Sequence, residues 1–231
     1  MRKISKLSVV IPVYNETNTI EQIIQKVKAV KLSSEIIVVD DGSTDGTKQK
    51  LKKVQKTDKK LKIIFHKRNQ GKGMAIRTGI KTASGDYTVI QDADLEYDPE
   101  DFHKLIKPIS EKKGEVVYGS RFTGEHRNMF FWHLMANKFL TLVTNILYNT
   151  TLSDMETCYK LFPTKLIQSL KLKCRGFEFD PEVTARVLKR KIRIYEVPIS
   201  YAGREYDEGK KITWTDGFIA LYTLLRYRLF D

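Results

Sequence analysis

Short apolar runs rich in valine and isoleucine recur through the first half of the chain. Their length and β-branched composition are typical of buried strands. The predicted strands are residues 7–14, 35–41, 61–67, 87–94 and 115–121, and a later one is expected at 193–201. Amphipathic stretches lie between them. Strands that alternate with helices predict an α/β fold, a mostly parallel sheet with helices on both faces.

Two of the intervening helices carry recognisable start signals. Residues 18–30 place isoleucine and valine at helical spacing, and Asn18 with Glu21 has the spacing of a capping box. A later helix follows Asp98, which would cap it, and Pro99, which would occupy its first turn. The sequence therefore predicts helix starts close behind the first and fourth strands.

Polar residues collect where each predicted strand ends. These segments read YNE, DDGSTDGT, NQGKG, DADLE and GSR in chain order. In open parallel sheets ligands bind at the carboxyl ends of the strands, so the five segments predict one shared site. The segment NQGKG lacks the full spacing of a nucleotide-hydrolysing phosphate loop, which argues against that class.

Acidic residues alternate along the end of the fourth strand, at Asp92, Asp94, Glu96 and Asp98. In an extended chain alternate side chains share one face, so these carboxylates are expected to converge. Oxygen ligands without cysteine or histidine suit Mg²⁺ or Mn²⁺, which also bridges to a diphosphate. For Glu96 and Asp98 a solvated, acid-rich helix start is the alternative.

The segment DDGSTDGT combines two acids with small residues. Small residues let a loop approach a ligand closely, and a carboxylate can accept hydrogen bonds from a base or a ribose. A simple turn between strand and helix, capped by Ser43 or Thr44, fits the same letters. This segment alone therefore leaves a nucleoside site and a turn both open.

The chain of 231 residues carries 41 Lys+Arg against 28 Asp+Glu, a net charge of +13. Such a charge favours polyanions, either nucleic acid or an anionic membrane surface, although lysines can also simply solubilise helices. A nucleic-acid-binding module would not explain the ordered acids, because carboxylates repel phosphate. Cys158 and Cys174 lack metal or redox spacing, which favours a reducing compartment.

Two later stretches are amphipathic, and neither is an uninterrupted apolar run of the ~20 residues that a spanning helix needs. In residues 129–149 the polar side chains form one stripe, namely His133, Asn137, Thr141 and Thr144. Residues 212–231 set aromatic and leucine side chains on one face beside arginines. Helices of this kind lie in a membrane interface or pack against the protein body.

Taken together, VVIPVYNE, IIVVDDGSTDGT, NQGKGMAIRTG, DADLEYDPE and GSRF resemble the inverting glycosyltransferases of family 2, which have the Rossmann-like GT-A fold. DMETCYKLF and VPISYAGREYDEGKK resemble the dolichyl-phosphate mannose synthase-like subgroup. The resemblance implies a single domain over 1–231, in which 1–127 binds the nucleotide sugar and 128–231 forms the acceptor side with interfacial helices.

Carried over position by position, the resemblance assigns three sets of residues. The nucleotide sugar is expected at Pro12, Tyr14, Glu16, Asp40, Asp41, Gly71, Lys72, Asp92, Ala93 and Asp94. The metal, Mg²⁺ or Mn²⁺, is expected at Asp92, Asp94 and Glu96. Catalytic roles are expected for Asp94, Arg121, Asp154, Arg204 and Lys210, with Asp154 either positioning a group or removing a proton.

The implied reaction moves a hexose from a nucleotide-diphosphate sugar to a polyprenyl phosphate, dolichyl or undecaprenyl. The enzyme would then lie peripherally on the cytoplasmic face of a membrane, without nucleic acid, and a membrane-spanning partner subunit is left open. Cys158 stands where mannose synthases often have glycine, so GDP-mannose, UDP-glucose and UDP-N-acetylhexosamine all stay open as donors. A soluble transferase acting on a glycan or protein hydroxyl is the main alternative.

Overall fold

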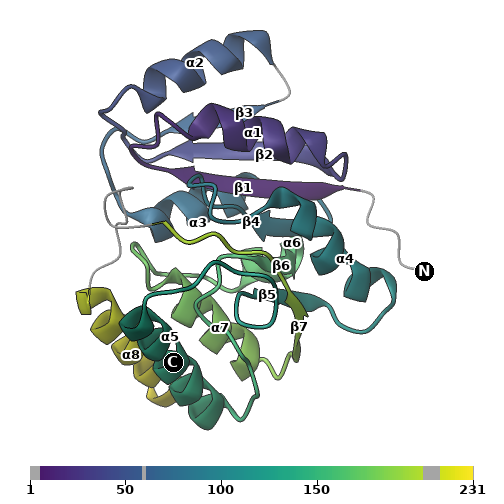
Figure 1. Ribbon diagram of the computed structural model, residues 1–231, viewed down its shortest axis with the longest axis vertical. Coiled ribbons are helices and arrows are strands. Elements are labelled where there is room, and N and C mark those ends of the chain that lie inside the picture. Colours follow the sequence, from purple (N-terminus) through teal and green to yellow (C-terminus); the bar gives the residue numbers. More distant parts are fainter. Residues whose placement is uncertain (1–5, 59–60, 205–213, 231) are drawn as a thin grey trace.

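The computed structural model describes residues 6–58, 61–204 and 214–230. Its centre is a seven-stranded sheet in the order β3-β2-β1-β4-β6-β5-β7 (Figure 1). The strands are β1 Leu7–Val13, β2 Ser33–Asp40, β3 Lys62–Phe65, β4 Tyr87–Ile90, β5 Val116–Ser120, β6 Lys160–Pro163 and β7 Ile194–Pro198. Only β6 runs antiparallel to its neighbours among these strands, so the prediction of a mostly parallel sheet is confirmed.

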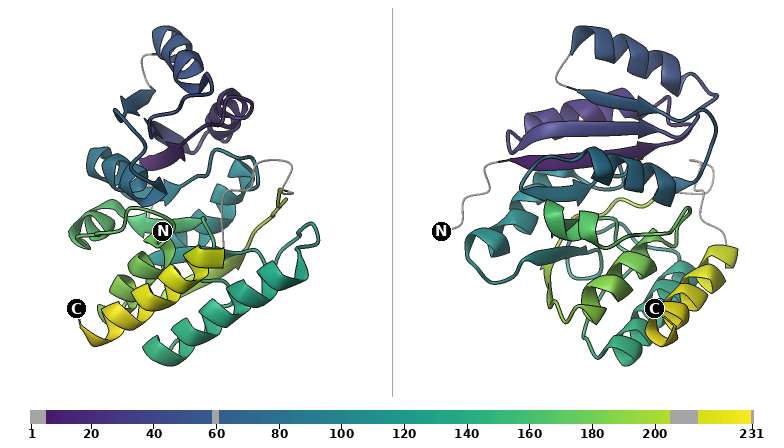
Figure 2. Two further views of the ribbon diagram at one scale, coloured as in Figure 1. Left: turned by 90° about the vertical axis from the view of Figure 1, so that its left-hand side faces the viewer. Right: turned by 180° about the vertical axis from the view of Figure 1, so that it is seen from behind.

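Helices cover both faces of this sheet, as predicted. The helices are α1 Ile20–Ala29, α2 Thr47–Thr57, α3 Lys72–Thr82, the short 3₁₀ turn η1 Pro99–Asp101, α4 Phe102–Ser110, α5 Phe131–Tyr148, α6 Thr164–Ser169, α7 Phe179–Lys189 and α8 Trp214–Leu229. Helices α1 and α4 lie on one face, whereas α3 and α6 lie on the other (Figure 2). Helices α5 and α8 run side by side at one end of the molecule (Figure 2).

The strand order reverses direction beside β1, which pairs with β2 on one side and β4 on the other. Such a switch point leaves a crevice at the carboxyl ends of the strands, where ligands bind in open α/β sheets. The backbone N–H of Asp41 donates to the carbonyl of Val13, so the segments after β1 and β2 lie against each other. The topology therefore brings the polar strand ends to one edge.

One apolar core contains buried residues from both halves of the chain, from Leu7 to Tyr201. Strand β5, from the first half, lies between β6 and β7 of the second. The two halves thus interleave in one sheet, and a boundary at residues 127 and 128 stays a prediction.

Local start signals were only partly interpreted correctly. The capping box at Asn18 is wrong, because the N-cap is Thr19, whose hydroxyl donates to Glu16 and caps no backbone N–H. The prediction for Asp98 is confirmed, since its side chain accepts from the N–H of Glu100 and Pro99 begins η1.

Strand β6 was not predicted, because its first residue is a lysine and only four residues form it. Lys160 is nevertheless fully buried, and Asp180 from α7 neutralises it. A buried charge paired with a carboxylate on a distant helix leaves no local signal in the sequence.

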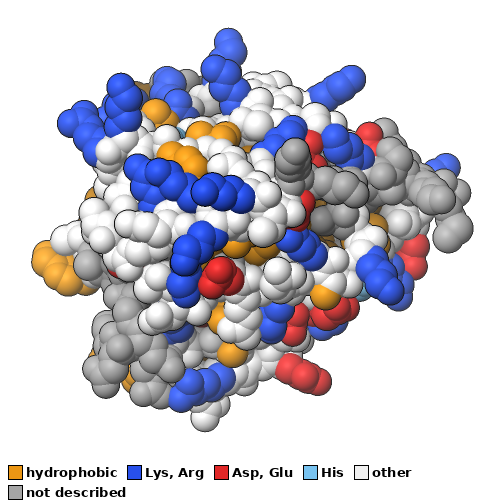
Figure 3. Space-filling model, turned by 90° about the horizontal axis from the view of Figure 1, so that it is seen from above, with side chains coloured by type: hydrophobic (Ala, Val, Ile, Leu, Met, Phe, Trp, Pro, Cys, Tyr) orange, Lys and Arg blue, Asp and Glu red, His pale blue; other side chains and the backbone are white. Residues whose placement is uncertain are grey.

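Helix α2 carries five lysines and has only two buried residues, Thr47 and Leu51. Seen from the α2 end of the molecule, basic side chains are spread over the surface with acidic ones among them (Figure 3). This distribution fits solvated helix faces better than a concentrated nucleic-acid-binding patch.

Candidate active site

The loop after β2 holds Asp40 and Asp41, which have different surroundings. Asp41 accepts from the backbone N–H groups of Gln70 and Gly71 at 3.0 and 2.7 Å, and it contacts His66 Nδ1 at 2.6 Å. Its carboxylate therefore holds the loop after β3 against the loop after β2. Sequence reasoning missed His66, because this partner follows a different strand.

Asp40 has a carboxylate oxygen that can still accept a hydrogen bond from a ligand. One of its oxygens accepts from the N–H of Ser43, whereas the buried Oδ2 has no hydrogen-bond partner in the described residues. A buried acceptor without a partner costs free energy unless a ligand satisfies it. Pro12 pairs with Val39, the residue before Asp40, so Pro12 and Asp40, two residues that the sequence assigned to the nucleotide sugar, lie at neighbouring strand ends.

Gly71 has positive φ, and a side chain there would meet the carbonyl oxygen of Arg175 at 2.2 Å. Only glycine therefore fits at this position, where the backbone passes close to that of Arg175. The next residue, Lys72, begins α3 and lies 2.8 Å from Asp92, so the start of α3 and the end of β4 are joined by an ion pair. Burial opposes the charge of Lys72, but the attraction of Asp92 outweighs burial and raises the pKa of Lys72.

Asp94 and Glu96 lie further along the same segment. Burial, Asp92 and Glu96 together raise the pKa of Asp94 to about 7, with Arg204 opposing. Glu96 accepts from the Tyr201 hydroxyl at 2.9 Å and from the backbone N–H of Arg204 at 2.8 Å. Asp92 and Glu96 are close enough to Asp94 to repel it, but the chain turns at residues 93–96 and is not the extended segment from which the sequence predicted convergence. Asp98 instead caps η1.

Arg204 spans the site. Its guanidinium lies 2.9 Å from Glu16 and donates to the carbonyl of Asp94 at 2.9 Å. Arg204 therefore lies between the segments after β1 and β4, both of which the sequence assigned to the nucleotide sugar.

These acids are chemically suited to a divalent cation. Asp94 is half-buried beside two like charges, a condition that a bound cation would relieve, and oxygen is the ligand that Mg²⁺ and Mn²⁺ prefer. Within residues 6–58, 61–204 and 214–230, however, no three acidic, histidine or cysteine side chains are gathered as a metal cluster. The assignment of the metal to Asp92, Asp94 and Glu96 stays a prediction.

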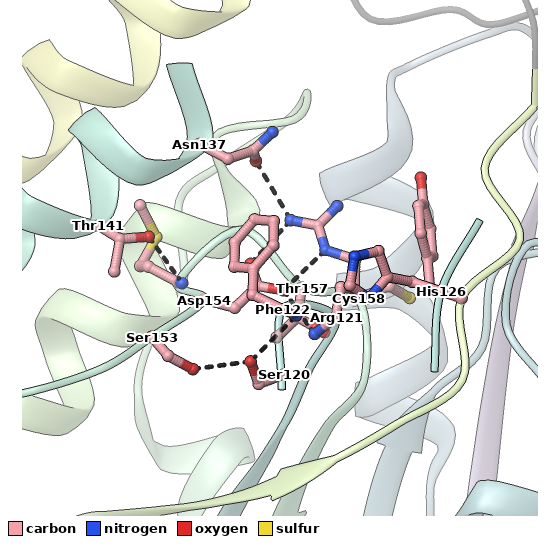
Figure 4. A network of polar contacts seen from close by, with 12 residues as sticks. Ser120, Arg121, Phe122, His126, Asn137, Thr141, Ser153, Asp154, Thr157 and Cys158 are labelled. Atoms are coloured by element: carbon pink, nitrogen blue, oxygen red, sulfur yellow. Dashed lines mark hydrogen bonds and ion pairs between the residues drawn. The ribbon is translucent and has the colours of Figure 1, made fainter. Parts of the chain in front are cut away.

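A second group of polar side chains surrounds Arg121, at the end of β5 (Figure 4). Arg121 donates through Nε and Nη2 to the two oxygens of Asp154, at 2.7 and 2.8 Å, and through Nη2 to Asn137 of α5 at 3.1 Å. Asp154 is completely buried and also accepts from the backbone N–H of Arg121. Asp154 thus fixes the orientation of the Arg121 guanidinium. The Nη1 atom of Arg121 takes part in none of these hydrogen bonds.

Two tyrosines that the sequence did not single out connect the groups. The ring of Tyr201 lies 5.4 Å from the guanidinium carbon of Arg121, while its hydroxyl contacts Glu96. The rings of Tyr97 and Tyr201 meet edge to face with centroids 5.3 Å apart, and the Tyr97 hydroxyl accepts from the N–H of Cys158. Both tyrosines lie within the motifs DADLEYDPE and VPISYAGREYDEGKK, and this position could have marked them as candidate site residues.

Ala93 is buried between the two aspartates, and the predicted residue Lys210 lies outside the described residues. The structure thus brings together the segments that carry most of the predicted site residues. It adds Asn137, His66, Tyr97 and Tyr201 to them.

Curated relatives resemble the chain over most of its length. It is 30% identical over 239 residues to UDP-N-acetylglucosamine–dolichyl-phosphate N-acetylglucosaminyltransferase of Methanococcus voltae, covering 95% of both chains. It is 31% identical to dolichol-phosphate mannosyltransferase of Pyrococcus furiosus, covering 89% of this chain and 59% of the relative. It is 29% identical to undecaprenyl-phosphate 4-deoxy-4-formamido-L-arabinose transferase of Proteus mirabilis, covering 90% of this chain and 63% of the relative.

Solved structures share the fold. Glucosyl-3-phosphoglycerate synthase from Mycobacterium tuberculosis, in complex with phosphoglyceric acid, superposes with a TM-score of 0.74 at 20% identity, over 96% of this chain and 79% of that one. The same enzyme in complex with Mn²⁺, uridine-diphosphate and phosphoglyceric acid gives a TM-score of 0.72 at 20% identity, over 98% and 79%.

Glycosyl transferase family 2 is matched over residues 8–170, a span that contains every strand end from β1 to β6. The GT-A fold expected from the motifs is confirmed by the sheet order and by the solved relatives. The chain belongs to glycosyltransferase family 2.

Proposed function

We propose that the enzyme moves a hexose from a nucleotide-diphosphate sugar to a polyprenyl phosphate, with inversion at the anomeric carbon. The observation that carries this proposal is the position of Arg121. Its guanidinium is fixed by Asn137 on the polar side of α5, and the opposite side of α5 is apolar and exposed. A cation for an acceptor phosphate thus lies beside a surface suited to the acceptor's lipid chain. The three named relatives, two acting on dolichyl and one on undecaprenyl phosphate, support it.

The charge arrangement suits an acceptor that is already an anion. An acceptor phosphate oxygen forms the bond to the anomeric carbon while the bond to the leaving diphosphate breaks, so no proton has to be removed. Asp154 has both oxygens engaged by Arg121, which favours a positioning role over that of a base. A divalent cation held by Asp92, Asp94 and Glu96 would supply charge stabilisation to the leaving diphosphate.

Turnover on a lipid phosphate tests the proposal directly. Purified enzyme is incubated with a polyprenyl phosphate and with GDP-mannose, UDP-glucose or UDP-N-acetylglucosamine in turn. We expect one donor to release nucleoside diphosphate in step with formation of a lipid-linked sugar. Release that needs a glycan or protein hydroxyl, with none on the lipid phosphate, would overturn the proposed acceptor.

The membrane side of the proposal depends on α5, which has an unusual polarity. Trp132 and Ile146 are 78% and 72% exposed. Thr141 and Thr144, from the polar stripe, are 3% and 0% exposed. A helix that only packed against the body would show the reverse arrangement.

Helix α8 extends the same surface. It packs beside α5 through Leu224 and Ala220, which share a small apolar cluster with Leu140. Its exposed apolar side chains are Trp214, Phe218, Ile219, Tyr222, Leu225 and Leu229.

No described helix has both the length and the apolar character that a membrane crossing requires. We therefore propose that the α5–α8 face lies in the interface of a bilayer, since Trp, Tyr and Arg suit that position. The cytoplasmic side of the membrane and a spanning partner subunit stay predictions.

We expect the protein to sediment with anionic vesicles more than with neutral ones, and high salt to weaken this binding, because part of the attraction is screened. Trp132→Glu should lower the partition coefficient by ~10-fold or more, since burying a large apolar side chain contributes about 1.5–3 kcal/mol. Tyr195→Glu is the matched control, because Tyr195 is also exposed but lies on β7. Absence of binding to either vesicle at low salt would contradict the membrane assignment.

A further inference from the structure

The segment 154–158, between α5 and β6, contacts both sides of the site. At one end Asp154 binds Arg121, and at the other the Cys158 thiol donates to the carbonyl of Ile90 at the end of β4; burial, and after it the charge of Asp92, raises the pKa of this thiol. The segment therefore crosses from the predicted acceptor side to the predicted diphosphate side. Residues 155–157 lie on the segment between these two ends.

Two consecutive side chains in this segment have unsatisfied oxygens. Glu156 Oε1 and Thr157 Oγ1 are buried and have no hydrogen-bond partner in the part of the chain that the structure describes. Buried polar atoms without partners are rare and costly, so their presence at a site points to a polar ligand. The backbone is fixed on either side, by Met155 N–H to Thr141 and by Cys158 N–H to Tyr97.

The surroundings of the Glu156 carboxyl group change its pKa. Burial raises its pKa to about 8, Asp180 and Asp154 contribute in the same direction, and Lys160 and Arg121 oppose them. At neutral pH the carboxyl group is thus mainly protonated, and it can both donate and accept a hydrogen bond. A sugar hydroxyl group has the same dual capacity.

Asp180 connects this carboxyl group to the donor side. Its charge acts on Glu156 and also on Lys72, the partner of Asp92. Along the chain Glu156 lies between Asp154, which binds Arg121, and Cys158, whose thiol donates to the carbonyl of Ile90 at the end of β4, two residues before Asp92. During transfer the sugar has to lie between the acceptor phosphate and the leaving diphosphate, which the proposed function assigns to these same two places.

We propose that Glu156 and Thr157 bind hydroxyl groups of the donor's hexose and so determine which sugar the enzyme accepts. The inference rests on the proposed function for the direction of transfer, but sugar binding can be measured without an acceptor. Its test is therefore independent of whether the acceptor is a lipid phosphate.

The first test compares two nucleotide sugars that share a nucleotide and differ in configuration at one sugar carbon, such as GDP-mannose and GDP-glucose or the corresponding UDP pair. Calorimetric Kd values are measured for both and for the free nucleoside diphosphate. We expect Glu156→Ala to change the ratio of the two sugar Kd values by ~10-fold, because a lost hydrogen bond to a sugar hydroxyl affects one epimer more. The Kd of the nucleoside diphosphate should stay unchanged. Glu156→Gln, of nearly the same volume, should change the ratio less.

The second test separates sugar binding from a structural role. Thr157→Val removes the hydroxyl group at almost constant volume and leaves no unsatisfied oxygen in the unliganded protein. We expect an equal or higher Tm without ligand, together with a ~5- to 10-fold weaker affinity for the nucleotide sugar. A structural hydroxyl group would give a lower Tm and unchanged affinity.

Glu115→Ala is the matched control, because Glu115 is an exposed glutamate just before β5 and should alter neither quantity. Wild-type protein that does not discriminate between the epimers would overturn the inference, as would equal weakening of both sugars by Glu156→Ala. If discrimination is lost in the variants while no lipid phosphate is ever glycosylated, the inference stands and the proposed acceptor is wrong.

Discussion

Replacing Asp94 by asparagine is expected to lower sugar transfer by ~10²- to 10³-fold, because it removes a preorganised charge from the diphosphate site at nearly constant volume. The fold should persist. Asp94 is half-buried beside Asp92 and Glu96, whose charges repel it, so a neutral side chain relieves repulsion. The free energy of unfolding should therefore be equal or higher. The measurement is nucleoside diphosphate release beside thermal unfolding of the same samples.

Asp98→Asn is the control for this change, since Asp98 belongs to the same acidic run but caps η1 and is half-exposed. Its turnover should stay near normal. Excess chelator should also stop wild-type transfer, and Mn²⁺ or Mg²⁺ should restore it. Full transfer in chelator, or normal turnover of Asp94→Asn, would remove the metal assignment.

Replacing Arg121 by lysine is expected to lower turnover on a polyprenyl phosphate by ~10²-fold, while nucleoside diphosphate affinity stays unchanged. Lysine retains the charge but lacks the planar fork by which Arg121 binds both oxygens of Asp154 while a further nitrogen stays available for a phosphate. The alanine variant is less informative, because it leaves the buried Asp154 carboxylate without its partner, a change that typically costs about 3–5 kcal/mol.

Arg190→Lys provides the comparison for this substitution. Arg190 donates to Ser169 at the end of α6 and has no contact with the predicted site residues in the described structure. It should retain normal turnover. If Arg121→Lys also retains it, the cation for the acceptor phosphate lies elsewhere and a hydroxyl acceptor becomes the better hypothesis.

The sequence predicted the sheet edge because strand ends leave a local signal, an apolar run followed at once by polar letters. It did not predict the pairs that assemble the edge. Glu16 and Arg204 are 188 positions apart, and Asp41 with His66 joins two different strand ends. No spacing within a window of residues reports such contacts, which arise only when the sheet order is fixed.

The polar stripe of α5 was visible as a pattern, but its direction was not. Helical spacing shows that two faces differ, and it leaves open which one turns inward. The usual preference for buried apolar faces would have placed Thr144 outside, whereas it is fully buried. The polar face of α5 turns inward because polar partners lie there, such as Arg121, which donates to Asn137.

The same helix bears Asn137, which contacts Arg121, and the exposed aromatic side chains that would enter the bilayer. An α-helix with its side chains is only ~10–12 Å across, so the bilayer surface and the acceptor cation would be separated by about one helix. The acceptor would then reach the site by moving laterally, with its isoprenoid tail still in the lipid. Its relevant concentration is the number of molecules per area of membrane, and diluting them with inert lipid would matter more than changing the volume of the solution.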